Sequence, residues 1–136
     1  MSDSLDRQPA PRSLHVELRR DVRAPGVARA AVAEELAQAG IDGRLGQTIV
    51  LLVSEVVSNA VRHSPGPGDA RIDLQATIGD RLVRVEVSDP GQGFTPRERD
   101  PERLGDGYGL YLLDKTATSW GVDGRGGTTV WFELER

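Results

Sequence analysis

The stretch from about Arg44 to Arg62 limits the fold most, because its polarity repeats with the period of an α-helix. On a helical wheel its apolar residues fill one broad arc, made of Leu45, Ile49, Leu52, Val53, Val56, Val57 and Ala60. A helix of this kind has to bury its apolar face against a second layer of structure. The pattern stops before Ser64–Gly68, whose prolines and glycines are incompatible with a continuing helix.

Alternating apolar and polar residues elsewhere in the chain predict the strands of that second layer. The expected strands are Leu14–Leu18, Ile72–Ile78, Val83–Val87, Ser119–Val122 and Thr128–Glu133. Two more helices are expected, an alanine-rich one at Val27–Ala39 that ends at Gly40 and a short one at about Tyr108–Ala117. The pattern therefore predicts an α+β two-layer sandwich, with a mixed, mostly antiparallel sheet and helices on one face.

Length and composition narrow the class of protein. With 136 residues the chain has the size of one domain, and we expect residues 14–136 to form it behind a disordered tail at residues 1–13. The absence of cysteine excludes disulfides and thiolate metal sites and fits a reducing compartment. The first residues are polar, without an apolar stretch for a signal peptide or anchor, so we expect a cytoplasmic protein with no membrane partner. A net charge of −4 gives no reason to expect nucleic-acid binding.

Two polar residues occupy strand positions that the alternation assigns to the core. Asp89 continues the inward face of the preceding valines, and a carboxylate there is costly unless donors reach it. Thr128 shares the inward face of the last strand in the same way. Gly91 and Gly93 follow Asp89, so the backbone can approach a flat ligand, and an adenine exocyclic amine is a natural donor. The alternative is a frayed strand end at which Asp89 starts a turn.

The long helix carries a polar stripe beside its apolar arc. Glu55, Asn59 and Arg62 are spaced i, i+4 and i+7, and His63 lies one turn beyond Asn59. A carboxylate, an amide and a cation aligned in this way suit a magnesium–phosphate site. A solvated helix edge with a weak Glu–Asn–Arg ladder explains the same residues.

A second glycine loop, Gly105–Leu110, opens the short helix. Glycines at a helix N-terminus expose backbone N–H groups at the positive end of the helix dipole, which is a seat for phosphate. The loop matches neither the dinucleotide fingerprint nor a P-loop. Alone it is a weak signal.

Taken together, these motifs resemble those of the GHKL ATPases, the superfamily of gyrase, histidine kinases and mismatch-repair ATPases. The segments 55–63, 89–93, 105–110 and 127–129 look like its N box, its two glycine boxes and its threonine box, in the right order. Within the superfamily the chain looks most like the free-standing anti-sigma-factor serine/threonine kinases. Leu52–Glu55, Trp120–Val122 and Thr129–Leu134 carry that likeness. The fold implied is the Bergerat type.

The resemblance implies a site for ATP and Mg²⁺. In it Asn59 would ligate Mg²⁺, Asp89 would bind the adenine amine beside Gly91 and Gly93, and Thr128 would join the adenine network. The second glycine loop would shape the phosphate end of the site through Gly105, Gly107, Tyr108, Gly109 and Leu110.

The implied activity is transfer of the γ-phosphoryl group of ATP to a serine or threonine of an antagonist protein. Glu55 would be the catalytic base, and Arg62 or His63 would reach phosphate. Phe94–Leu104 would be the lid over the nucleotide. The expected partners are a sigma factor, an anti-anti-sigma antagonist or both. Two alternatives remain open, a non-catalytic module that binds a partner when ATP closes the lid, and a slow ATPase.

Self-association is a further expectation. Trp131 points to the face opposite Val130 and Phe132, on the side of the sheet without helices. The alternatives there are partial cover by neighbouring side chains and a homodimer, which the resemblance favours.

Overall fold

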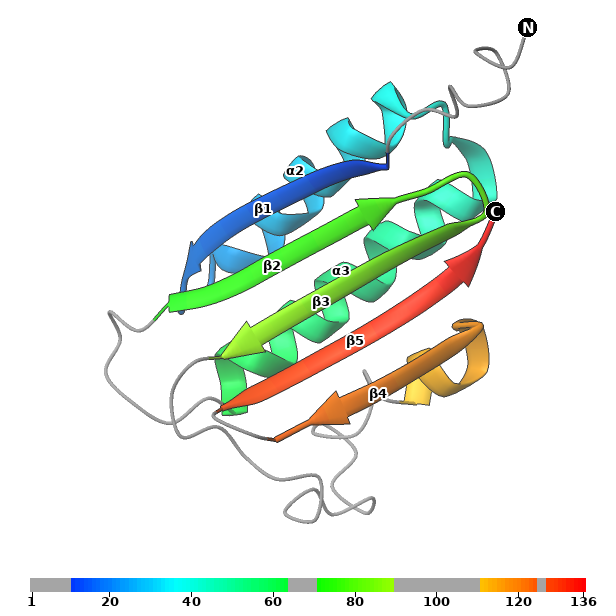
Figure 1. Cartoon of the computed structure of the whole chain (residues 1–136). Coiled ribbons are helices and arrows are strands. Elements are labelled where there is room, and N and C mark those ends of the chain that lie inside the picture. The colour runs from blue at the N-terminus through cyan, green and yellow to red at the C-terminus, as the bar shows by residue number, and fades with distance from the viewer. Residues whose placement is uncertain (1–10, 64–70, 90–110, 125–126) are drawn as a thin grey trace, which may run out of the picture.

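The computed structural model describes residues 11–63, 71–89, 111–124 and 127–136. The named elements, labelled in Figure 1, are β1 (Arg12–Arg19), α2 (Ala24–Gln38), α3 (Gly43–His63), β2 (Arg71–Ile78), β3 (Leu82–Asp89), β4 (Ser119–Asp123) and β5 (Thr128–Glu135). Residues 111–116 are also helical. All the predicted elements are present where the structure describes the chain. Strand β1 begins at Arg12, two residues inside the segment expected to be a tail.

Five strands form one sheet in the order β1-β2-β3-β5-β4. Every pairing among these described strands is antiparallel, where the sequence pattern predicted a mixed, mostly antiparallel sheet. The turn at Gly79–Arg81 connects β2 to β3 directly, as the hairpin pattern predicted. Strand β5 inserts between β3 and β4, so the last strand in sequence is an inner strand and β4 lies at the edge (Figure 1).

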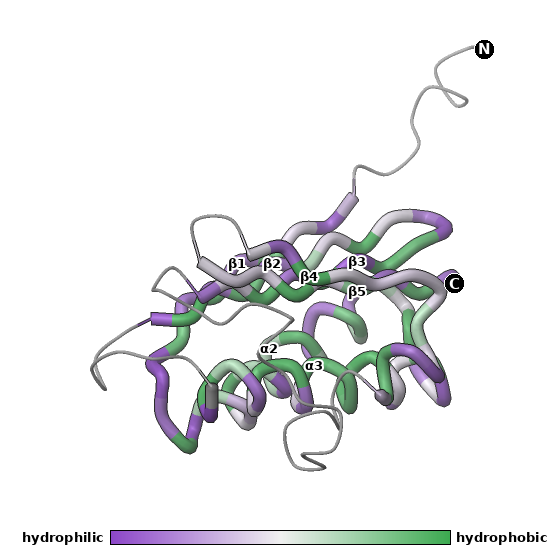
Figure 2. Tube along the Cα trace, turned by 90° about the horizontal axis from the view of Figure 1, so that it is seen from below, coloured by the Kyte–Doolittle hydropathy of each residue, from purple (hydrophilic) through white to green (hydrophobic). Residues whose placement is uncertain are grey.

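The molecule has two layers, with α2 and α3 on the same side of the sheet (Figure 2). Strand β3 shows why, because every second residue from Val83 to Asp89 is buried while the residues between are half-buried. Among the described residues the core between the layers is aliphatic, and Phe132 is the one aromatic residue among the fully buried side chains. The two-layer α+β sandwich with helices on one face is confirmed.

The helices form a hairpin around two glycines with positive φ. Gly40 has φ 78° and Gly43 has φ 63°, conformations that only glycine adopts without strain. Helix α2 begins at Ala24, earlier than expected, because Pro25 fits the first helical turn, where an N–H has no intrahelical partner. Arg29 Nη1 donates to Ser54 Oγ at 2.9 Å across the hairpin. The tight turn thus sets α3 antiparallel to α2, with its C-terminal end away from the turn.

The opposite face of the sheet carries a polar cross-strand network. Arg84 donates to Glu133 at 2.8 Å and to Glu86 at 3.3 Å. Its guanidinium lies 4.4 Å from the centroid of the Trp131 ring. Burial lowers the pKa of Arg84 while the bonds to the two carboxylates raise it, and the net result is a pKa above its ordinary value. Trp131 is therefore partly covered by a neighbour that stays charged.

Candidate nucleotide site

Of the residues that the structure describes, three polar or charged ones are buried. They are Asn59 with 3% of its surface exposed, Asp89 with 5% and Thr128 with 5%. Each was singled out from the sequence as a candidate ligand-binding residue. Burial of polar side chains is costly unless they bond to the protein or a ligand, so such residues mark a site better than exposed ones do.

Asp89 and Thr128 are direct neighbours across the sheet. Asp89 is the last residue of β3, Thr128 is the first of β5, and the two are Cα partners in the antiparallel register. Side chains paired in this way have Cβ atoms about 5 Å apart and point to the same face. A carboxylate and a hydroxyl therefore lie side by side on the helix-covered face, as the alternation predicted for each strand.

Asn59 lies in the last turns of α3. Arg62, three residues on, donates from Nη2 to Asn59 Oδ1 at 2.6 Å. Glu55 is half-buried and lies one turn before Asn59 on the same side of the helix. The helix thus carries the predicted polar stripe, and its Asn–Arg contact is present as a short hydrogen bond.

The fold brings the ends of these elements together. Figure 1 shows the C-terminal end of α3 at the same end of the molecule as the end of β3 and the start of β5. Helix α3 packs on β3, with Val56 and Val57 buried on the helix and Val87 and Val130 buried next to the Asp89–Thr128 pair. Asn59, Asp89 and Thr128 therefore lie toward one end of the interface between the layers.

Several sequence-predicted residues lie outside the described residues. They are Gly91 and Gly93 of the first glycine loop, the lid segment Phe94–Leu104, and Gly105, Gly107, Tyr108, Gly109 and Leu110 of the second loop. His63 belongs to α3, but its side chain is not described. Their roles stay predictions.

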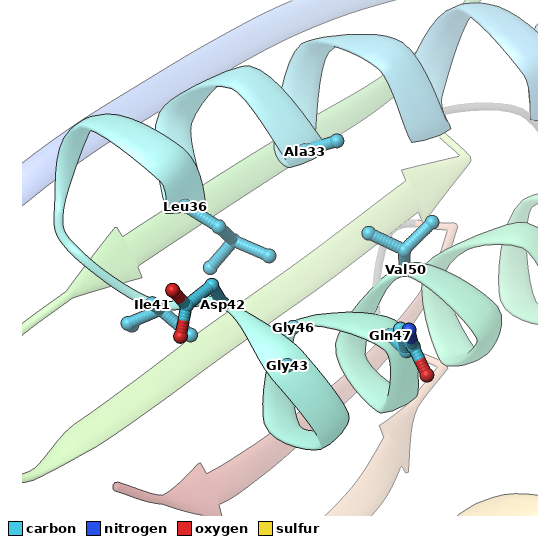
Figure 3. A pocket seen from close by; sticks show the side chains of 8 residues that line it. All are labelled: Ala33, Leu36, Ile41, Asp42, Gly43, Gly46, Gln47 and Val50. Carbon is cyan, nitrogen blue, oxygen red and sulfur yellow. The ribbon is translucent and has the colours of Figure 1, made fainter.

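A hollow of about 280 Å³ lies elsewhere, at the turn between α2 and α3. Figure 3 shows residues that line it, among them Leu36, Ile41, Asp42 and Val50. Of the predicted site residues whose side chains the structure describes, none lines it. It lies at the N-terminal end of α3, opposite the end that carries Asn59.

Sequence reasoning missed the contacts on the helix-free face. Ser88 Oγ lies 2.9 Å from Thr129 Oγ1, directly behind the Asp89–Thr128 pair. Trp131 lies between Arg84 and Gly121, and a Cβ on Gly121 would come 2.7 Å from the indole nitrogen. The signal for both is the strand register, which alternation within one strand does not provide.

The three buried groups suit an adenine nucleotide with a divalent cation. A carboxylate accepts a hydrogen bond from an exocyclic amine, and a hydroxyl both donates and accepts beside it. A carboxamide oxygen is a ligand that Mg²⁺ accepts, together with the oxygens of bound phosphates. The donor set therefore fits this class of ligand.

The chain is a two-layer α+β domain, and its three buried polar residues form a candidate nucleotide site. Residues 18–134 match the family described as the histidine kinase-like ATPase domain. The chain belongs to this family. The resemblance drawn from the four sequence motifs is thereby confirmed.

Two solved structures resemble the chain. A chain with the RsbU and RsbW domains of Rv1364c from Mycobacterium tuberculosis is 27% identical, with a TM-score of 0.72, over 92% of this chain and 33% of that one. The histidine kinase domain of the Erythrobacter litoralis EL346 blue-light activated histidine kinase is 22% identical, with a TM-score of 0.55. The match covers 81% of this chain and 60% of that one. The first match supports closeness to anti-sigma-type kinases, and the second supports the fold.

The present chain spans about a third of the length of the Rv1364c chain. Among the described residues, no helix combines the length and the apolar character needed to cross a membrane.

Proposed function

We propose that this domain binds ATP with Mg²⁺ and transfers the γ-phosphoryl group to a serine or threonine hydroxyl of a partner protein. The observation that carries the proposal is the burial of Asn59, Asp89 and Thr128 toward one end of a histidine kinase-like ATPase fold. The similarity to the RsbU–RsbW chain supports an anti-sigma type of kinase.

The adenine end of the proposed site is formed by β3 and β5. Asp89 accepts a hydrogen bond from the adenine amine, and Thr128, its cross-strand partner, joins the same network. Guanine presents a carbonyl at the place of that amine, which a carboxylate repels. The site therefore selects adenine. We propose that Gly91 and Gly93, which lack side chains, let the backbone come close to the adenine base.

The phosphate end is formed by α3 and the second glycine loop. Asn59 would supply an oxygen ligand to Mg²⁺, which binds oxygen donors. The residues assigned to the phosphates are Arg62, His63, Gly105, Gly107, Tyr108, Gly109 and Leu110. When bound, ATP would supply the phosphoryl group, and Mg²⁺ would neutralise part of the negative charge of the phosphates.

Glu55 is the proposed base. Its carboxylate lies one helical turn from Asn59, so it faces the same end of the site. There it accepts the proton of the partner hydroxyl as that oxygen attacks phosphorus, and ADP leaves. The remaining work of the protein is positioning and charge neutralisation, which dominate phosphoryl transfer.

A partner protein has to supply the hydroxyl. We propose an anti-anti-sigma antagonist as the phosphate acceptor and a sigma factor as the protein held in check, in the cytoplasm, where ATP is available. A homodimer through the helix-free face of the sheet is a separate proposal. The contact of Arg84 with Trp131 covers part of the aromatic surface on which that expectation rested.

Glu55→Gln tests the proposed catalysis. Affinity for ATP should stay within a few-fold, while single-turnover transfer to an antagonist protein should fall about 10²-fold or more, the usual contribution of a general base. The matched control is Glu34→Gln, an exposed carboxylate on α2, which should leave transfer unchanged.

Two other results would point away from this assignment. Unchanged transfer in the Glu55→Gln protein would exclude Glu55 as the base. No transfer by the wild-type protein to any antagonist, with ATP still bound, would favour a non-catalytic binding module.

A further inference from the structure

Arg62 holds the one atom of Asn59 that a metal would use. Its Nη2 donates to Asn59 Oδ1 at 2.6 Å, and the Asn59 carboxamide is almost fully buried. Oδ1 is the sole acceptor of that side chain. Hydrogen bonds from a guanidinium are shorter and stronger than neutral ones, and this bond has the short length of that class. The contact therefore fixes which end of the carboxamide faces the guanidinium.

The Arg62 guanidinium and a metal bound to the same Asn59 oxygen would repel each other electrostatically. Mg²⁺ binds oxygen at about 2.1 Å, so it would stand at most roughly 4.7 Å from Nη2 of Arg62. Two cations at that distance repel each other strongly in a partly buried site. Arg62 is in the last turn of α3 and is exposed to solvent, so its side chain has room to leave. The Asn59 side chain is buried and has no such room to move.

We propose that Arg62 is a displaceable counter-cation of Asn59. Its guanidinium holds Oδ1 in the nucleotide-free protein and yields that oxygen to Mg²⁺ when the metal arrives with the nucleotide. This rests on the proposed function, in which Asn59 is the metal ligand. Arg62 thereby keeps the buried carboxamide oriented before binding and lowers the gain in nucleotide affinity that Mg²⁺ brings.

The quantity that tests the proposal is the ratio of two dissociation constants for a non-hydrolysable ATP analogue. The ratio is the dissociation constant measured by calorimetry with EDTA divided by the one measured with excess MgCl₂, so a larger ratio means that Mg²⁺ tightens binding more. The ratio removes any contact of Arg62 with the nucleotide that is the same in both states. In Arg62→Gln it should rise about tenfold over wild type, equivalent to about 1.4 kcal/mol, close to the lower end of values for hydrogen bonds to charged groups.

Two control variants separate the contact from the charge. Arg62→Lys keeps the cation and should keep the ratio near that of wild type. Arg44→Gln removes the same charge from an exposed residue in the first turn of α3 and should leave the ratio unchanged. A ratio in Arg62→Gln that equals or falls below the wild-type ratio would overturn the proposal.

A measurement on the nucleotide-free protein checks the contact itself. Arg62→Gln should lower the melting temperature of the wild-type protein by more than that of Asn59→Ala, in which the acceptor of this hydrogen bond is gone. Equal shifts in both backgrounds would overturn the proposal.

Failure of the proposed function gives a different pattern. If Mg²⁺ tightens binding in Asn59→Ala as much as in wild type, the metal site lies elsewhere, and both the site assignment and the displacement of Arg62 are wrong. If Asn59→Ala abolishes the tightening and Arg62→Gln leaves the ratio unchanged, the metal site stands and the displacement alone is wrong.

Discussion

Gly121→Ala should destabilise the sheet, because the ring of Trp131 occupies the space that a side chain would need. An added Cβ would lie 2.7 Å from the indole nitrogen and 2.9 Å from Cε2 and Cζ2 of the same ring. Ordinary contacts begin near 3.4 Å, so the ring would have to move by about 0.5–0.7 Å. The Arg84 guanidinium over the ring resists that movement. Overpacking of this kind costs about 1–3 kcal/mol, or a fall in Tm of about 3–12 °C for a domain of this size.

Thermal unfolding followed by circular dichroism measures this cost. The matched control is Gly124→Ala, since a Cβ at Gly124 meets nothing within 4 Å and the residue is exposed. In a Trp131→Leu background the cost of Gly121→Ala should largely disappear, because the obstructing ring is gone. If Gly121→Ala has the same melting temperature as Gly124→Ala and wild type, the inference that the Trp131 ring packs over Gly121 is wrong.

Two other predictions concern Thr128 and self-association. Thr128→Val keeps the shape of the buried side chain and removes its hydroxyl. The affinity for ATP in calorimetry should therefore fall about five- to tenfold, the value of one hydrogen bond, with secondary structure unchanged. Equal affinity would exclude Thr128 from the adenine network. If a homodimer forms through the helix-free face, light scattering at high concentration should give twice the monomer mass. Glu86→Arg together with Glu133→Arg should then return the protein to the monomer mass. A monomer mass for the wild-type protein would exclude the dimer.

The layers and the orientation of the polar residues could be predicted because they depend on local periodicity. The alternation from Val83 to Val87 was enough to place Asp89 on the core face, where the structure finds it buried. The helical spacing of Glu55, Asn59 and Arg62 likewise predicted one stripe, and Arg62 does contact Asn59.

The pairing of distant segments could not be predicted in the same way. That Asp89 faces Thr128 depends on the insertion of β5 between β3 and β4, a choice that no single strand encodes. The start of β1 at Arg12 has a similar cause, because Arg12 donates to Glu35 at 3.1 Å and to Gln38 at 2.6 Å on α2. These contacts join residues more than twenty positions apart, and they extend a strand whose first residues are polar.

Binding of ATP to the Asp89→Asn protein tests the central claim most directly. The substitution keeps the size of the buried side chain and removes the charge that is proposed to accept the adenine amine. Titration calorimetry should show a loss of affinity of about 10- to 100-fold, the range for a hydrogen bond to a charged group, while circular dichroism shows an intact fold. GTP should compete poorly with ATP for the wild-type protein. Unchanged affinity of Asp89→Asn for ATP would contradict the assignment of this site.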